Sequence, residues 1–152
     1  RLGVVNGPNL NLLGTREPDR YGGLSLAQIE SLVRVEADRL GVEIDWSQSN
    51  HEGEIVDTIQ RLGATAQGLI VNAGAFTHTS LAVRDAIAGV GLPCVEVHLT
   101  NIFARESARR QSLLADVVLG VIAGFGPTSY LLGLRALHAD SPMASEHDRR
   151  QA

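Results

Sequence analysis

The strongest constraint on the fold is the alternation of short apolar stretches with longer segments of helical periodicity. The apolar stretches predict strands at residues 2–5, 42–46, 67–71, 94–98 and 117–122. Between and after them, apolar residues recur every three or four positions, which predicts helices at 25–40, 52–62, 80–88 and 127–138. Strands separated by helices form βαβ units, and such units build a parallel sheet with helices on both faces. We therefore expect an α/β protein with a five-stranded parallel sheet.

Capping signals support several of these boundaries. Ser25 with Gln28 three residues later is typical of a capping box, and Pro127 is a favourable first-turn residue. An additional short, arginine-rich helix is expected near residues 103–110. There is no internal repeat or linker, so residues 1–138 are predicted to form one domain, followed by a polar, flexible tail at 139–152.

Composition narrows the functional classes. A length of 152 residues with 44% apolar residues suits one globular domain, and a net charge of -4 argues against nucleic acid binding. The single cysteine, Cys94, lies in an apolar run and is interpreted as a core residue that forms no internal disulfide. No segment has the length of a membrane span or the layout of a signal peptide, so we expect a cytoplasmic protein.

All 13 basic residues are arginine, and the sequence contains no lysine. This excludes a Schiff-base lysine, a lysine general base and the lysine of a phosphate-binding P-loop.

Polar side chains follow several predicted strands. The stretch from Asn6 to Gly22 is rich in turn formers and predicts a long loop after the first strand. Asn9 lies in this loop, Asn72 and His78 follow the third strand, and His98 ends the fourth. Open parallel sheets bind ligands at the carboxyl ends of their strands. These side chains are therefore expected to meet at one edge of the sheet.

Glu96 and His98 are candidates for acid–base chemistry. They are two residues apart on a strand and should point to the same face. A carboxylate beside a histidine fixes its tautomer and stabilises the protonated ring, which suits a general acid. The alternative is a buried polar pair with a structural role only.

Other candidates remain open from the residues alone. His78 can cap a helix or bind a substrate hydroxyl, and Arg105, Arg109 and Arg110 form either an anion site or a solvated face. A metal site made of His51, His78, Glu96 and His98 has no known zinc-ligand spacing.

Tyr21 is a candidate base if its pKa is lowered. A reduction by about three units requires about 4 kcal/mol of preference for the anion. One arginine about 4 Å away supplies roughly that much at an effective dielectric near 20, before desolvation is subtracted. Arg16 and Arg109 are the candidate partners, and the alternative is a tyrosine that only packs on the loop.

Several motifs in order closely resemble the type II 3-dehydroquinate dehydratase family. They are the segments at 6–11, 14–22, 48–53, 72–80 and 96–106, within a match that spans about 2–137. The resemblance implies a flavodoxin-like three-layer sandwich and the dehydration of 3-dehydroquinate to 3-dehydroshikimate in the shikimate or quinate pathway. It also implies that no metal or organic cofactor takes part.

The resemblance further implies a role for each matching residue. Tyr21 would remove a proton beside the ketone to give an enolate, and Arg16 would keep Tyr21 ionised. Asn9 would hold a water on the enolate oxygen, while His98, oriented by Glu96, would protonate the departing hydroxyl. The implied substrate contacts are Asn72, His78, Leu99, Thr100 and Arg109, together with Asp85, which would reach a neighbouring subunit of a dodecamer built from trimers.

The alternative is a function of another class. A flavodoxin-like binding or signalling module would hold a nucleotide or phosphate at the same strand ends. The opening loop lacks the glycine spacing of dinucleotide sites, which disfavours this alternative.

Overall fold

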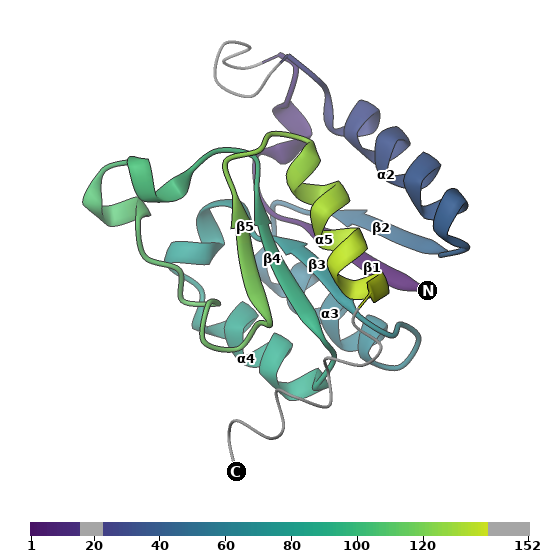
Figure 1. Ribbon diagram of the computed structural model, residues 1–152. Helices are drawn as coiled ribbons and strands as arrows, with labels where there is room; N and C mark the ends of the chain where they lie inside the picture. Colours follow the sequence, from purple (N-terminus) through teal and green to yellow (C-terminus); the bar gives the residue numbers. More distant parts are fainter. Residues whose placement is uncertain (16–22, 140–152) are drawn as a thin grey trace.

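The computed structural model describes residues 1–15 and 23–139, which form a sheet covered by helices on both faces (Figure 1). The strands are β1 (Leu2–Asn6), β2 (Ile44–Gln48), β3 (Leu69–Asn72), β4 (Cys94–His98) and β5 (Gly120–Ala123). The α-helices are α2 (Leu26–Leu40), α3 (Glu52–Gly63), α4 (Leu81–Val90) and α5 (Thr128–Ala139). The predicted order of strands and helices is confirmed.

All five strands are parallel, in the order β2-β1-β3-β4-β5. The direction in which strands are added reverses at β1, because β2 lies on one side of it and β3 on the other. This is the flavodoxin-like order, in which ligands bind outside the carboxyl ends of the strands at the switch point. The expected fold class is therefore confirmed, and the switch point lies between β1 and β3.

Each face of the sheet has its own apolar core. Helices α2 and α5 cover one face, where Ile29 and Leu134 pack on Val4 and Val97. Helices α3 and α4 cover the other face, with a core that includes the buried Cys94. Burial raises the pKa of the Cys94 thiol, so it stays protonated as a core residue. The interpretation of Cys94 from the sequence is confirmed.

Strands β2, β3 and β5 begin later than predicted, and β3, expected at 67–71, spans Leu69–Asn72. β2 was expected at 42–46 but runs to Gln48, because Ser47 and Gln48 continue the parallel ladder beside Val5 and Asn6. β5 was expected from residue 117 but begins at Gly120. Val118 is buried without being in a strand. The apolar character of this segment therefore predicted that Val118 is buried, but it did not predict which residues pair in the sheet.

The expected arginine-rich helix at 103–110 is wrong. The segment forms two separate 3-10 turns, η3 (Ile102–Ala104) and η4 (Ser107–Arg109). Between them, Arg105 has an extended backbone and Glu106 has a ψ of 155°, so neither residue continues a helix. The side chain of Asn101 accepts a bond from the Phe103 N–H at 3.1 Å and closes the first turn.

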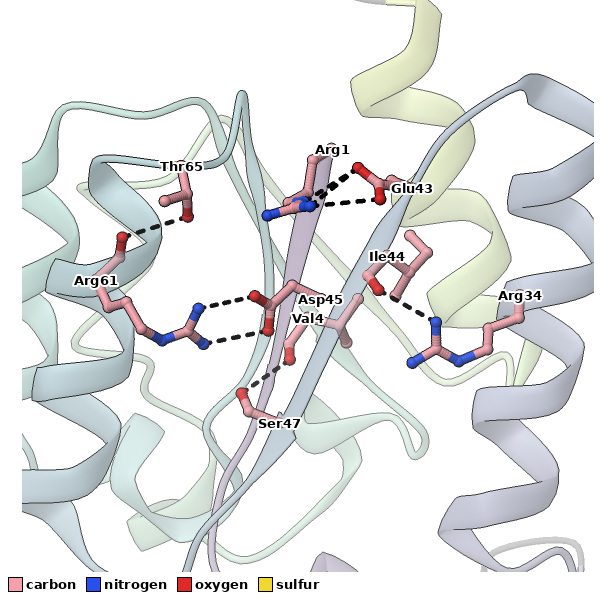
Figure 2. A network of polar contacts seen from close by, with 9 residues as sticks. All are labelled: Arg1, Val4, Arg34, Glu43, Ile44, Asp45, Ser47, Arg61 and Thr65. Atoms are coloured by element: carbon pink, nitrogen blue, oxygen red, sulfur yellow. Dashed lines mark hydrogen bonds and ion pairs between the residues drawn. The ribbon is translucent and has the colours of Figure 1, made fainter.

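Arginines from both helical layers reach the edge strand β2 (Figure 2). Arg61 of α3 makes two bonds to the carboxylate of Asp45, at 2.7 and 3.1 Å. On the other face, Arg34 of α2 donates to the backbone oxygen of Ile44 at 3.1 Å. Charged side chains beside an exposed strand disfavour pairing with other chains. The arrangement thus protects the β2 edge.

No helix within residues 1–15 and 23–139 is long and apolar enough to cross a membrane. The tail expected from residue 139 onward falls almost wholly outside the described residues, since Ala139 is the last residue of α5.

Candidate active site

A cavity of about 220 Å³ lies at the carboxyl end of the sheet, beside the switch point. It brings together the last residues of β3 and β4 and residues from the loops that follow β1, β3 and β4. Its lining includes seven residues expected at a site: Asn9, Asn72, His78, His98, Leu99, Thr100 and Arg109. The prediction that the polar strand ends meet at one edge of the sheet is confirmed.

Two loops cross in backbone contact beneath this cavity. A Cβ added at Gly7 would lie 2.2 Å from the backbone oxygen of Ala73, so only glycine fits there. Gly74 has a φ of +57°, and an added Cβ would lie 3.1 Å from the oxygen of Pro8. The glycines of the first and third strand ends therefore allow these two loops to lie against each other.

Asn9 is held in an uncommon backbone conformation. Its φ is 67°, which makes it the only non-glycine residue of positive φ in the described ranges. Its N–H donates to Oδ1 of Asn50 at 3.0 Å, and Gln48 donates to that same oxygen and to the backbone oxygen of Gly7. Gln48, the last residue of β2, and Asn50 thus fix the position of Asn9. The sequence did not reveal this role.

A buried network of amides lies under the cavity on the α5 side. Asn6 and Asn72 are neighbours in the register of β1 and β3. The hydroxyl of Tyr130 donates to Oδ1 of Asn6 at 2.7 Å and accepts from Nδ2 of Asn72 at 2.8 Å. Burial raises the pKa of Tyr130, so this hydroxyl stays neutral. The network fixes which end of the Asn72 amide faces the cavity.

Glu96 and His98 point to the same face of β4, as predicted. Nε2 of His98 lies 2.7 Å from Oε1 of Glu96, and both side chains are buried. A carboxylate accepts hydrogen bonds, so Nε2 carries the proton and Nδ1 is the nitrogen left for a ligand.

Glu96 has two further hydrogen-bond donors. Thr77 donates to Oε1 at 3.0 Å, and the single O–H of Ser112 lies within hydrogen-bond distance of both oxygens, 3.0 Å from Oε1 and 2.7 Å from Oε2. Neither residue was expected at the site. Their distance in sequence from Glu96 gave no spacing signal, although Thr77 adjoins the predicted His78.

His78 is oriented in the opposite sense to His98. Its Nδ1 lies 2.7 Å from the backbone oxygen of Gln111, which can only accept. Nδ1 is therefore the protonated nitrogen, and Nε2 remains for a ligand in the cavity. The histidines thus present different nitrogens to the same space.

Arginines border the cavity beside Thr100. Arg105 also lines it, and its Nη2 donates to Oγ1 of Thr100 at 2.7 Å. Arg109 forms an ion pair with Glu106 at 3.3 Å. Two guanidinium groups at the rim favour an anionic ligand.

Other predicted site residues lie elsewhere. Asp85 is on α4, does not line this cavity, and pairs with Arg84 at 3.0 Å. Arg16 and Tyr21 lie outside the described residues. Within the described part of the chain, no three histidine, cysteine, aspartate or glutamate side chains are arranged to hold a metal. The arrangement therefore lends no support to the metal alternative.

Comparison with known proteins identifies relatives of this chain. Residues 1–138 match the family described as dehydroquinase class II. A protein named 3-dehydroquinate dehydratase from Azorhizobium caulinodans is 59% identical over 139 residues, which are 91% of this chain and 94% of that protein.

Solved structures agree with these relatives. The type II dehydroquinase from Propionibacterium acnes superposes with a TM-score of 0.87 at 33% identity, over 91% of this chain and 95% of that one. The enzyme from Butyrivibrio crossotus gives a TM-score of 0.87 at 38% identity, over 90% and 95%. The chain belongs to the class II dehydroquinase family.

Proposed function

We propose that this chain dehydrates 3-dehydroquinate to 3-dehydroshikimate in the shikimate or quinate pathway, by anti elimination of water through an enolate. The observation that carries the proposal is the Glu96–His98 pair, which borders an arginine-rimmed cavity at the switch point of the sheet. Membership of the dehydroquinase family supplies the substrate.

His98 is the proposed general acid. Glu96 holds its Nε2–H, so a proton for the departing hydroxyl comes from Nδ1. Donation from Nδ1 requires a ring protonated on both nitrogens, and the adjacent carboxylate stabilises that cation.

Tyr21 is the proposed base and Arg16 its partner, on the strength of the family's motif. Tyr21 removes the proton from the carbon beside the ketone, and the electron pair moves onto the ketone oxygen as an enolate. Asn9 lines the cavity and would hold the water that donates a hydrogen bond to this oxygen. No metal or organic cofactor takes part in this scheme.

The substrate is a carboxylate that carries several hydroxyl groups, and the lining suits both. Asn72, His78 and Arg109 are proposed to bind the hydroxyls, while the backbone turn at Leu99 and Thr100 binds the carboxylate. The guanidinium of Arg105 adds positive charge beside that turn.

We also propose that the enzyme is a cytoplasmic homododecamer built from trimers. Asp85 is largely exposed on α4, where it is available to a neighbouring subunit's site. Light scattering at several protein concentrations measures the assembly, and a monodisperse monomer would contradict this part.

The test is the appearance of the conjugated enone, followed by ultraviolet absorbance after adding 3-dehydroquinate with a chelator present. The variants Tyr21→Phe and His98→Ala are each expected to lower kcat by about 10²–10⁴-fold, the usual size of an acid–base contribution. His138→Ala, which changes an exposed histidine of α5, is the matched control and should keep wild-type turnover. Near-normal turnover by either site variant would refute the assigned role, and activity lost to the chelator would restore the metal alternative.

A further inference from the structure

Glu96 is a fully buried carboxylate, with a relative exposure of 0%. A buried charge is tolerated only when hydrogen-bond donors surround it. Three side chains supply these donors: His98, Thr77 and Ser112. Ser112 is the one that reaches both carboxylate oxygens.

The contact of Ser112 restricts rotation of the carboxylate. A single bond to His98 would leave the carboxylate plane free to turn about the chain of Glu96. Ser112 lies within 3.0 Å of Oε1 and 2.7 Å of Oε2, and Thr77 adds a third direction at Oε1. The orientation of the His98 ring follows from that of the carboxylate, since its Nε2 bonds to the same Oε1.

Ser112 is itself held in a short segment that binds both sides of the site. The backbone oxygen of Gln111 bonds to the ring of His78 at 2.7 Å, and the N–H of Leu113 donates to the backbone oxygen of Thr77 at 2.8 Å. The Leu114 N–H donates to Oγ of Ser112 at 3.0 Å and orients the hydroxyl. Residues 111–114 therefore hold both histidines in place, one directly and one through Glu96.

We propose that Ser112, assisted by Thr77, is a positioning residue for the acid, which fixes the Glu96 carboxylate so that His98 presents Nδ1 to the substrate. Ser112 does not line the cavity, so it acts through Glu96 rather than on the substrate. The expected change in kcat rests on the proposed function, but the expected change in the Glu96–His98 pair does not.

The kinetic test is Ser112→Ala. A bond to a charged group is worth enough to change a rate by about 10- to 100-fold, so kcat should fall by that factor. KM should stay within about twofold, because uniform substrate binding is untouched. Thr77→Val removes the second hydroxyl with little change of shape and should lower kcat in the same direction.

The matched control is Ser80→Ala. Ser80 is a buried serine whose hydroxyl, like that of Ser112, accepts a backbone N–H, from Val83 at 2.9 Å, but it makes no hydrogen bond to Glu96 in the described structure. If Ser112→Ala lowered kcat only by making the fold less stable, Ser80→Ala would lower kcat to a similar extent. Equal kcat in Ser112→Ala and Ser80→Ala, in an enzyme that dehydrates 3-dehydroquinate, would overturn the inference.

A second readout does not depend on activity. Deuterium exchange at the imidazole C2–H, followed by mass spectrometry across a pH series, reports the titration midpoint of each of the 5 histidines. In the described structure, the charged or titratable groups that bond to His98 or line the same cavity are Glu96 of β4, His78 of η2 (Gly74–His78), Arg105 and Arg109. All of them remain in Ser112→Ala.

Removal of the Ser112 hydroxyl takes one hydrogen-bond donor from the Glu96 carboxylate, so the Glu96–His98 pair should bind its proton more tightly. The exchange midpoint of the pair should therefore be higher in Ser112→Ala than in the wild-type protein. An unchanged or lowered midpoint would overturn the inference whatever the substrate is. A wild-type protein that fails to dehydrate 3-dehydroquinate would refute the proposed function and leave this measurement valid.

Discussion

The buried hydroxyl of Tyr130 offers a sharp test of how the amide network is stabilised. The variant Tyr130→Phe keeps the ring, which packs 5.8 Å from that of Trp46, and removes only the hydroxyl. Two groups then lose a partner, namely Oδ1 of Asn6 and one N–H of Asn72. Because Asn6 is 0% and Asn72 3% exposed, water cannot readily replace the missing oxygen.

The expected cost follows from that count. Leaving one buried polar group without a partner costs about 1–3 kcal/mol, so the loss of two partners should lower the free energy of unfolding by about 2–6 kcal/mol. This is a large part of the roughly 5–15 kcal/mol that stabilises a typical domain, but the fold should survive.

Urea unfolding measures this change. The fluorescence of the single tryptophan, Trp46, reports on the same region, and circular dichroism provides an independent signal. All variants are compared at one protein concentration, because any assembly would add to the apparent stability. Ser129→Ala is the control, since its buried hydroxyl serves one backbone N–H, that of the exposed Phe125.

Ser129→Ala should lower the free energy of unfolding by only about 0.5–1.5 kcal/mol, as expected for one hydrogen bond. If Tyr130→Phe costs less than about 0.5 kcal/mol, or no more than this control, the amides are not dependent on the phenol and the reasoning is refuted.

Two further variants test the backbone crossing and the β2 edge. Gly7→Ala should prevent normal folding or abolish turnover, because its Cβ would lie 2.2 Å from the backbone oxygen of Ala73. Soluble yield and the enone assay measure these effects, and a fully active variant would contradict the argument. The hydrogen bond from Arg61 lowers the pKa of Asp45, so the pair stabilises the fold above the unfolded pKa of about 3.9 and loses this effect as the pH falls through the lower folded value. Asp45→Asn should therefore cost less than about 1 kcal/mol at pH 7 and nothing at low pH, as measured by urea unfolding; a cost that persists at low pH would contradict the argument.

The sequence predicted the fold well where its periodicity and capping were strong. The helix after Ser25 begins with the expected capping box, and its C-cap is Gly41, at a φ of 69°. The prediction failed at 103–110, where arginine and alanine favour a helix but the chain forms two short turns. Local propensity is a weak determinant there, because Arg105 and Thr100 bond to each other at the cavity.

The site was predicted in part for a related reason. Residues at strand ends, such as Asn72 and His98, could be assigned because parallel strands end at one edge. Ser112 and Tyr130 could not, since each reaches its partners only through tertiary packing. The roles of Arg16 and Tyr21 remain predictions, because both lie outside the described residues.

The sheet keeps two kinds of polar group apart. Alternation along β4 turns Glu96 and His98 toward the α3 and α4 side, together with Cys94, while alternation along β3 turns Asn72 toward Tyr130 on the α5 side. The amides and the Glu96–His98 pair therefore share no hydrogen bond in the described part of the chain, and they meet only at the cavity. In the proposed mechanism, this separation would let His98 take up a second proton beside Glu96 without drawing the amides away from the substrate, which a single mixed network would not allow.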